Sequence, residues 1–231
     1  MLSRIPPLLK DDAMSAQTKY AAMSRRAAMT AAALAAMATL AGCNGGGTAG
    51  KAEGEMAMGA ADGAKVTVVE YASVTCHVCA AWQKDNWAAF KAAYVDTNKV
   101  RYVFRELPTG PVNVAVAGFM IARCAGEDKY FDVVHNIMAS QEEWQAGVNP
   151  RDTLFRIGNG AGLNNQQIEA CIKDPEGIKA ADARARASQT AGVDGTPAFF
   201  INGVQVISPG SASGPTMADL SRAIDAELAK G

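Results

Sequence analysis

The sequence predicts a single α/β domain in which a block of helices is inserted into a small core that contains a sheet. A strand, a helix and a second strand follow one another between residues 65 and 107, and helical segments fill about residues 108–190. Two short strands around an Asn-Gly turn and a last amphipathic helix complete the chain. A strand-helix-strand unit is typical of parallel strands, and an Asn-Gly turn is typical of an antiparallel hairpin.

The first unit carries the clearest strand pattern. Residues 65–71 read KVTVVEY, which is apolar and β-branched enough for a buried strand. Thr75 is expected to cap a helix over about residues 76–94, and a second strand is expected at residues 100–107. Glu70 is the anomaly, because a bare carboxylate is costly in a strand that is covered on both faces.

The helical block begins where Pro, Thr, Gly and Pro at residues 108–111 break the chain. After a first apolar helix, further helices are expected at about 128–140, 151–159, 164–173 and 176–191. Gly192 can end the last of these as a left-handed cap, and a closing helix is expected at about 216–229. The complete order is that of a thioredoxin fold with a helical insertion at about 108–190.

The first 43 residues have the layout of a bacterial export signal. Arg25 and Arg26 precede an apolar stretch of about fifteen residues, shorter than the roughly 20 of a membrane span. The stretch ends in Leu-Ala-Gly-Cys at residues 40–43, which resembles a lipobox. We therefore expect export to the periplasm and lipidation of Cys43, which would anchor the protein to a membrane that faces the periplasm. The alternative is an ordinary signal that is cleaved after a small residue.

Residues 44–63 are dominated by Gly, Ala and small polar side chains. Such a segment cannot bury enough apolar surface to offset the entropy of ordering. We therefore expect a flexible tether at 44–63 and a folded domain at 64–231.

The charge of the chain argues against one class of partner. Lys and Arg number 22 and Asp and Glu number 23, so the formal net charge is −1. A chain this balanced has no strong field to attract nucleic acid. We expect no nucleic-acid partner.

The sequence Cys76-His77-Val78-Cys79 lies at the predicted junction between the first strand and its helix. A sulfur in the first turn of a helix meets free backbone N–H groups and the positive end of the helix dipole, which favour its thiolate. We expect Cys76 to be the exposed nucleophile and Cys79 the buried resolving cysteine. The alternatives are half of a zinc site, which would need a second cysteine pair, and a static structural disulfide.

The segments VVEYASVTCHVCA and VDGTPAFFING resemble the DsbA family of thiol-disulfide oxidoreductases, and the resemblance covers most of residues 64–231. It implies a thioredoxin fold with an inserted helical domain. It also implies that Pro197 is a cis-proline opposite the active cysteines and that the backbone of Thr196 pairs with substrate peptide. The alternative for Pro197 is an ordinary proline at the start of a strand.

The same resemblance assigns roles to two further residues. Family members carry an acidic residue beneath the resolving cysteine, so Glu70 is expected to relay protons to Cys79; the alternative is a glutamate at a strand edge that reaches solvent. The family's commonest motif has proline and then histidine between the cysteines, whereas here His77 comes first. His77 either stabilises the Cys76 thiolate or is a solvated residue at the helix start without a role.

Two cysteines remain after Cys43 and the redox pair. In an oxidising compartment an even number of cysteines favours pairing, so Cys124 and Cys171 are expected to form a structural disulfide. Each follows an apolar helical pattern, and two buried free thiols are the alternative.

The resemblance implies an enzyme that donates the Cys76–Cys79 disulfide to reduced or unfolded exported proteins and is re-oxidised by a DsbB-like membrane oxidase. We expect a monomer that needs no cofactor beyond this disulfide and no metal. One alternative is a reductase or isomerase that uses the same residues. Another, of a different class, is a periplasmic copper-handling protein with Cys76, His77 and Cys79 as soft ligands.

Overall fold

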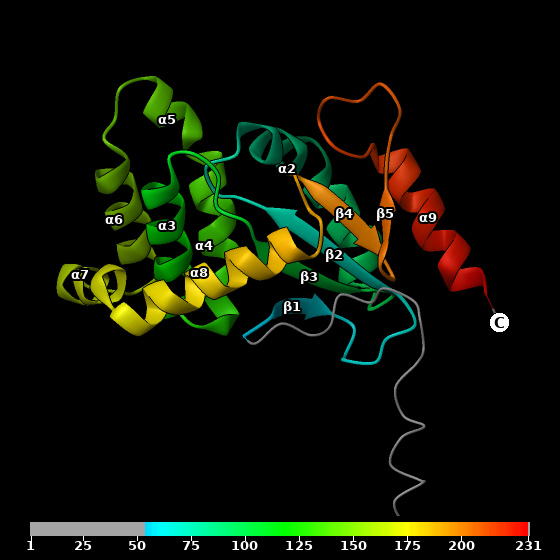
Figure 1. Cartoon of the computed structure of the whole chain (residues 1–231), viewed down its shortest axis with the longest axis horizontal. Coiled ribbons are helices and arrows are strands. Elements are labelled where there is room, and N and C mark those ends of the chain that lie inside the picture. The colour runs from blue at the N-terminus through cyan, green and yellow to red at the C-terminus, as the bar shows by residue number, and fades with distance from the viewer. Residues whose placement is uncertain (1–53, 231) are drawn as a thin grey trace, which may run out of the picture. The chain divides into compact units, whose positions relative to one another are not determined.

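The computed structural model describes residues 54–230 (Figure 1). The predicted export signal at 1–43, which includes Cys43, and the predicted tether as far as residue 53 lie outside the described residues. The described chain forms a mixed sheet in the order β1-β3-β2-β4-β5. The strands are β1 Met56–Gly59, β2 Thr67–Ala72, β3 Arg101–Glu106, β4 Ala198–Ile201 and β5 Val204–Val206.

The strand pairings follow from the connections between the strands. β2 and β3 are parallel, because helix α2 (His77–Phe90) and the π-helical turn η1 (Lys91–Val95) cross from one to the other. β4 pairs antiparallel with β2 and is joined to β5 by the turn at Asn202 and Gly203, both of which have positive φ. This arrangement confirms the predicted α/β class and thioredoxin-like sheet.

The predicted tether at 44–63 is wrong in part, because residues 56–59 form strand β1. β1 pairs antiparallel with β3, and Met56 is buried. The composition concealed this strand, since backbone pairing does not require β-branched side chains. Glu55 fixes its start by an ion pair with Arg105 at 2.9 Å. The folded domain therefore begins before residue 64.

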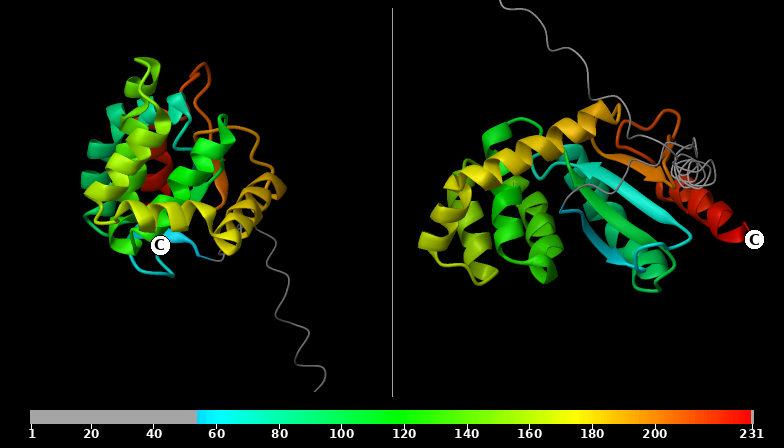
Figure 2. Two further views of the ribbon diagram at one scale, coloured as in Figure 1. Left: turned by 90° about the vertical axis from the view of Figure 1, so that its left-hand side faces the viewer. Right: turned by 60° about the horizontal axis from the view of Figure 1, so that its bottom comes forward.

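The inserted block lies at one end of the sheet, and α8 runs back from it along β3 (Figures 1 and 2). Its helices are α3 Val112–Cys124, α4 Glu127–Ala139, α5 Gln141–Gln145, α6 Pro150–Gly160, α7 Asn165–Lys173 and α8 Pro175–Thr190. The closing helix α9 spans Met217–Ala229. Gly192, with φ of +76°, follows α8 as expected. Within residues 54–230, no helix is long and apolar enough to cross a membrane.

The sheet is covered on both faces, as the apolar strands predicted. Val68 and Ala72 of β2 belong to the larger apolar cluster, which also contains Cys79. Val69 and Tyr71 point the other way and belong to a smaller cluster. Val68 and Ala72 therefore lie on the face of β2 that is beneath the predicted redox pair.

A buried carboxylate joins the insertion to the core. Glu106, the last residue of β3, accepts hydrogen bonds from Arg123 Nε at 2.6 Å, Arg184 Nε at 2.8 Å and the Tyr130 hydroxyl at 2.9 Å. The three donors come from α3, α8 and α4. A buried carboxylate with two arginines and a hydroxyl is well compensated, so the end of β3 is fixed against three helices of the block.

Candidate functional site

The predicted nucleophile, Cys76, caps helix α2. Cys76 has the extended backbone of an N-cap residue (φ −78°, ψ 112°), and its Sγ accepts a hydrogen bond from the Cys79 N–H at 3.1 Å. The expectation that Thr75 is the cap is wrong. The Thr75 hydroxyl instead donates to the Thr109 carbonyl at 3.0 Å, because the helix begins one residue later than expected.

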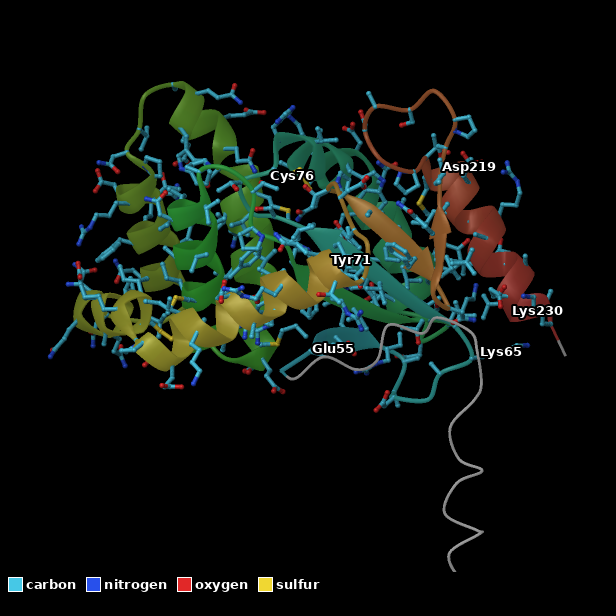
Figure 3. All side chains as sticks on the ribbon, in the orientation of Figure 1. Glu55, Lys65, Tyr71, Cys76, Asp219 and Lys230 are labelled. Carbon is cyan, nitrogen blue, oxygen red and sulfur yellow. A yellow bond between two sulfur atoms is a disulfide. The ribbon has the colours of Figure 1, made fainter. Side chains whose placement is uncertain are left out.

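Cys76 and Cys79 form a pair whose Cα atoms are 5.2 Å apart. Cys76 is expected to be exposed but is buried in this structure, at 8% exposure, and Cys79 is fully buried. An incoming thiolate can therefore reach Cys76 more easily than Cys79. Figure 3 marks Cys76 where β2 passes into α2. The unpaired N–H groups and the dipole of α2 favour a thiolate at this position.

The Thr196-Pro197 peptide bond is cis, and the Thr196 carbonyl oxygen lies 3.5 Å from Cys76 Sγ. Pro197 is buried and begins the approach to β4. The structure thus brings both predicted substrate-binding residues, Thr196 and Pro197, next to the predicted nucleophile Cys76.

Sequence reasoning missed Gly214, which supports Pro197. A Cβ atom at Gly214 would lie 2.8 Å from Pro197 Cγ, and its φ of +82° also favours glycine. The next residue, Pro215, accepts a hydrogen bond from Trp82 Nε1 of α2 at 2.8 Å. The loop before α9 therefore touches both the proline and the helix of the site. Gly-Pro before the N-cap Thr216 is the sequence signal that marks this turn.

His77 is the exposed first residue of α2. It lines a groove of about 570 Å³ between α2 and the end of α4 with α5, and Trp87 and Met138 also line this groove. The structure records no hydrogen bond between His77 and Cys76 in the described chain. Any effect of His77 on the thiolate would therefore act through space.

Glu70 is buried at 4% exposure in β2, the central strand of the sheet, so the alternative of a glutamate that reaches solvent is wrong. Its Oε2 accepts a hydrogen bond from the Tyr102 hydroxyl at 2.5 Å. Burial raises the pKa of Glu70 from 4.5 to about 7, and the bond from Tyr102 opposes this rise. Glu70 lies on the face of β2 whose cluster contains Cys79. Tyr102 was not predicted, because its partner is 32 residues away.

Cys124 and Cys171 are also brought together. They join the end of α3 to α7, with their Cα atoms 6.5 Å apart. Cys171 is buried but Cys124 is exposed, so the alternative of two buried thiols is wrong for Cys124. The pair would be accessible to reductants from the side of Cys124.

No group of three or more His, Cys, Asp or Glu that could hold a metal ion occurs in residues 54–230.

Comparison with known proteins places these features in a family. Residues 51–226 match the family described as Thioredoxin. A putative protein-disulfide oxidoreductase from Rickettsia bellii is 32% identical over 155 residues, which are 66% of this chain and 59% of the relative. The chain thus spans about three fifths of the length of that relative.

Solved structures share the fold at low identity. Wolbachia pipientis α-DsbA1 has a TM-score of 0.66 and 22% identity, over 77% of this chain and 92% of that protein. A protein-disulfide isomerase from Novosphingobium aromaticivorans has a TM-score of 0.62 and 20% identity, over 78% of this chain and all of that protein. With its thioredoxin-like sheet, its inserted helices and its Cys-x-x-Cys pair at the start of α2, the chain belongs to the thioredoxin family and has a DsbA-like fold.

Proposed function

We propose that the protein is a thiol-disulfide oxidoreductase that donates the Cys76–Cys79 disulfide to exported proteins. The observation that carries this proposal is the Cys76 sulfur at the N-cap of α2, beside the cis-proline Pro197. The name of the Rickettsia bellii relative, a putative protein-disulfide oxidoreductase, agrees with it.

The reaction is an exchange of two electrons. A substrate thiolate attacks Cys76 Sγ, a substrate–Cys76 disulfide forms, and the Cys76–Cys79 bond breaks with Cys79 as the leaving thiolate. A second thiolate of the substrate then attacks the substrate sulfur, and Cys76 leaves as a thiolate. The substrate is oxidised to a disulfide and the enzyme is reduced to a dithiol. The start of the helix stabilises the Cys76 thiolate as it leaves. The disulfide of the enzyme is therefore more oxidising than the disulfide of the substrate.

Glu70 fits a role in the proton balance of this exchange. The leaving thiolate of Cys79 forms in a fully buried position, where a charge is unfavourable. A carboxyl group whose pKa is about 7 holds a proton for part of the time near neutral pH. We propose that Glu70 delivers this proton to Cys79 during reduction and takes it back during oxidation.

The neighbourhood of Pro197 suggests how substrate is held. The Thr196 carbonyl faces Cys76 and a cis-proline has no N–H, so an extended peptide can run past the sulfur without a competing donor. We propose that Thr196 pairs with the backbone of the substrate and that His77, at the exposed rim, favours the Cys76 thiolate electrostatically.

We further propose the cellular setting that the sequence indicates. The protein would be a monomer, exported to the periplasm and anchored through a lipid on Cys43, and a DsbB-like membrane oxidase would re-oxidise it. Fractionation tests the anchor, because wild type should be found with membranes and Cys43→Ala should be soluble. Equal solubility of the two would remove the lipid from the proposal.

The activity is tested with a reduced, unfolded protein that regains activity when its disulfides form. The oxidised enzyme should speed this oxidation with no metal present, and Cys76→Ala should not. Stoichiometric binding of copper without exchange activity would favour the copper-handling alternative instead.

The direction of the reaction needs a separate measurement, since a reductase or isomerase uses the same residues and one similar structure is of a protein-disulfide isomerase. Repair of a scrambled disulfide protein distinguishes an isomerase. The reduction potential of the Cys76–Cys79 pair distinguishes an oxidant, which we expect to lie above the potential of thioredoxin, about −270 mV.

A further inference from the structure

A glutamine of the inserted block reaches the backbone beside the redox pair. Gln141 is the first residue of α5, and its side chain is buried. Its Nε2 donates hydrogen bonds to the carbonyl oxygens of Val74 at 2.8 Å and of Cys76 at 3.2 Å. We propose that Gln141 is a positioning residue for the reaction, because it fixes the bend through which the chain leaves β2 and places the Cys76 sulfur at the start of α2.

The two carbonyls that Gln141 binds, those of Val74 and Cys76, belong to the bend between the end of β2 and the start of α2. The Cys76 carbonyl also accepts the first hydrogen bond of α2, from the Ala80 N–H at 3.0 Å. The Cys76 sulfur meanwhile accepts the bond from Cys79 N–H that caps the helix. The Val74 carbonyl lies just before the bend and receives the shorter of the two bonds from Gln141. One amide group thus spans the residues on either side of Thr75 and restrains the residue that carries the nucleophile.

The loop is held from its other side by different atoms. Ser73 Oγ accepts from the Thr109 N–H at 3.1 Å, and Thr75 Oγ1 donates to the Thr109 carbonyl at 3.0 Å. These bonds hold residues 73 and 75, whereas Gln141 holds residues 74 and 76. Of the two anchors, Gln141 is the one that bonds the residue whose sulfur reacts.

The position of the sulfur determines how much the helix start stabilises its thiolate. The effect of a helix dipole falls off within the first turn, and the capping bond requires the extended backbone that Cys76 adopts. Without Gln141, the freed carbonyls would turn toward water and the sulfur would lose part of this geometry. We expect the pKa of Cys76 to rise by about 0.5 to 1 unit, which corresponds to a roughly three- to tenfold smaller acid dissociation constant.

The test compares two glutamines of the same short helix. Gln141→Met removes the amide donor and keeps the length of the side chain. Gln145→Met makes the same substitution at an exposed position that lines the same groove. Both are made in the full-length chain, and neither alters His77 or Glu70, the titratable groups to which the proposed reaction assigns a role.

Two quantities are measured for each variant. The first is the pKa of Cys76 in a Cys79→Ala background, from the rate of alkylation against pH. The second is the rate at which the oxidised enzyme forms a disulfide in a reduced peptide. Gln141→Met should raise the pKa of Cys76 and slow the exchange about two- to threefold, because Cys76 leaves as a less stable thiolate in the second step. Gln145→Met should match wild type in both quantities. A folded Gln141→Met with an unchanged Cys76 pKa would overturn the proposal.

If Gln141→Met does not fold, Gln141→Asn provides the decisive variant. It keeps the polar amide, but its side chain is one methylene shorter, which moves the donor away from the two carbonyls. The pKa of Cys76 should again rise, and an unchanged value would overturn the role of Gln141. The inference rests on the proposed exchange activity, but the two can fail separately. Loss of the proposed function would appear as an inactive wild type, whereas failure of the inference would appear as an unchanged pKa in an active enzyme.

Discussion

Replacing Glu70 by glutamine should flatten the pH dependence of stability near neutral pH. Glu70 is buried beneath α2, and burial raises its pKa from 4.5 to about 7. Between these two values the folded protein holds a proton that the unfolded chain has released. Glutamine fits the same space and can still accept the hydrogen bond of Tyr102, but it does not ionise. Glu70→Gln therefore lacks the pH-dependent contribution of this proton to the free energy of unfolding.

The sign follows from the direction of the shift. Because the pKa is raised in the folded state, the neutral carboxyl group supports folding fully below pH 4.5, and this support is lost as the pH rises through 7. The shift corresponds to about 3 kcal/mol at 1.36 kcal/mol per unit. Between about pH 5 and pH 8, wild type should lose about 2 to 3 kcal/mol more unfolding free energy than Glu70→Gln.

Urea unfolding at a series of pH values measures this difference. Both proteins are kept oxidised, so that neither Cys76 nor Cys79 titrates. His135 acts in the opposite direction, because burial and the charge of Lys91 lower its pKa to about 4 and its neutral form favours folding. That contribution is present in both proteins and cancels in the comparison. Parallel curves for wild type and Glu70→Gln would refute the buried, protonated carboxyl group.

In a Cys79→Ala protein, the pKa of Cys76 should lie well below the ~8.5 of a free thiol. Ultraviolet absorbance of the thiolate against pH measures this pKa, and a value near ~8.5 would show that the helix start has no effect. Pro197→Thr should fold but release mixed disulfides slowly, because an added N–H lies near the attacked sulfur. Adducts that disappear on reduction should then be visible on gels, and their absence with unchanged turnover would remove Pro197 from the site. Alkylation of the unreduced, unfolded protein should leave Cys124 and Cys171 unlabelled. Their bridge closes a loop across 47 residues and should contribute about 4 kcal/mol in the chain-entropy model, whereas labelled cysteines would show free thiols.

Much of the fold could be predicted because apolar periodicity is local. The first strand was expected at 65–71 and occurs at 67–72, and the helix expected at 164–173 occurs at 165–173. The strand is a continuous apolar run that is buried on both faces, and the helix has apolar side chains whose spacing matches the face that it buries. Ends are less certain, since the cap depends on one residue, and here the sulfur of Cys76 took the place expected for the Thr75 hydroxyl.

Elements that are stabilised from outside their own sequence were missed. β1 is held by pairing with β3 and by ion pairs of Glu55, neither of which leaves a periodic pattern in its own residues. Helix α5 is five residues long, too short for the helical period to repeat. Both elements lie where tertiary contacts, rather than propensity, determine the conformation of the backbone.

The same distinction between local patterns and tertiary contacts applies to the candidate site. The Cys-x-x-Cys spacing and a proline before a hairpin strand are local, and they located Cys76 and Pro197. The groups that tune them are distant in sequence, and Gln141 lies 65 residues from Cys76. A carbonyl can accept from any donor that the fold brings to it, so no pattern around Cys76 specifies that its partner is a glutamine of the insertion.

This dependence has a consequence for how the insertion is understood. The block supplies the donors for buried Glu106 at the end of β3 and for the carbonyls of Val74 and Cys76 at the start of α2. Without it, a buried carboxylate and two backbone carbonyls would lack these donors, each at a cost in free energy. The helical insertion is therefore part of the support of the candidate site, because the sheet alone does not satisfy the polar groups around Cys76.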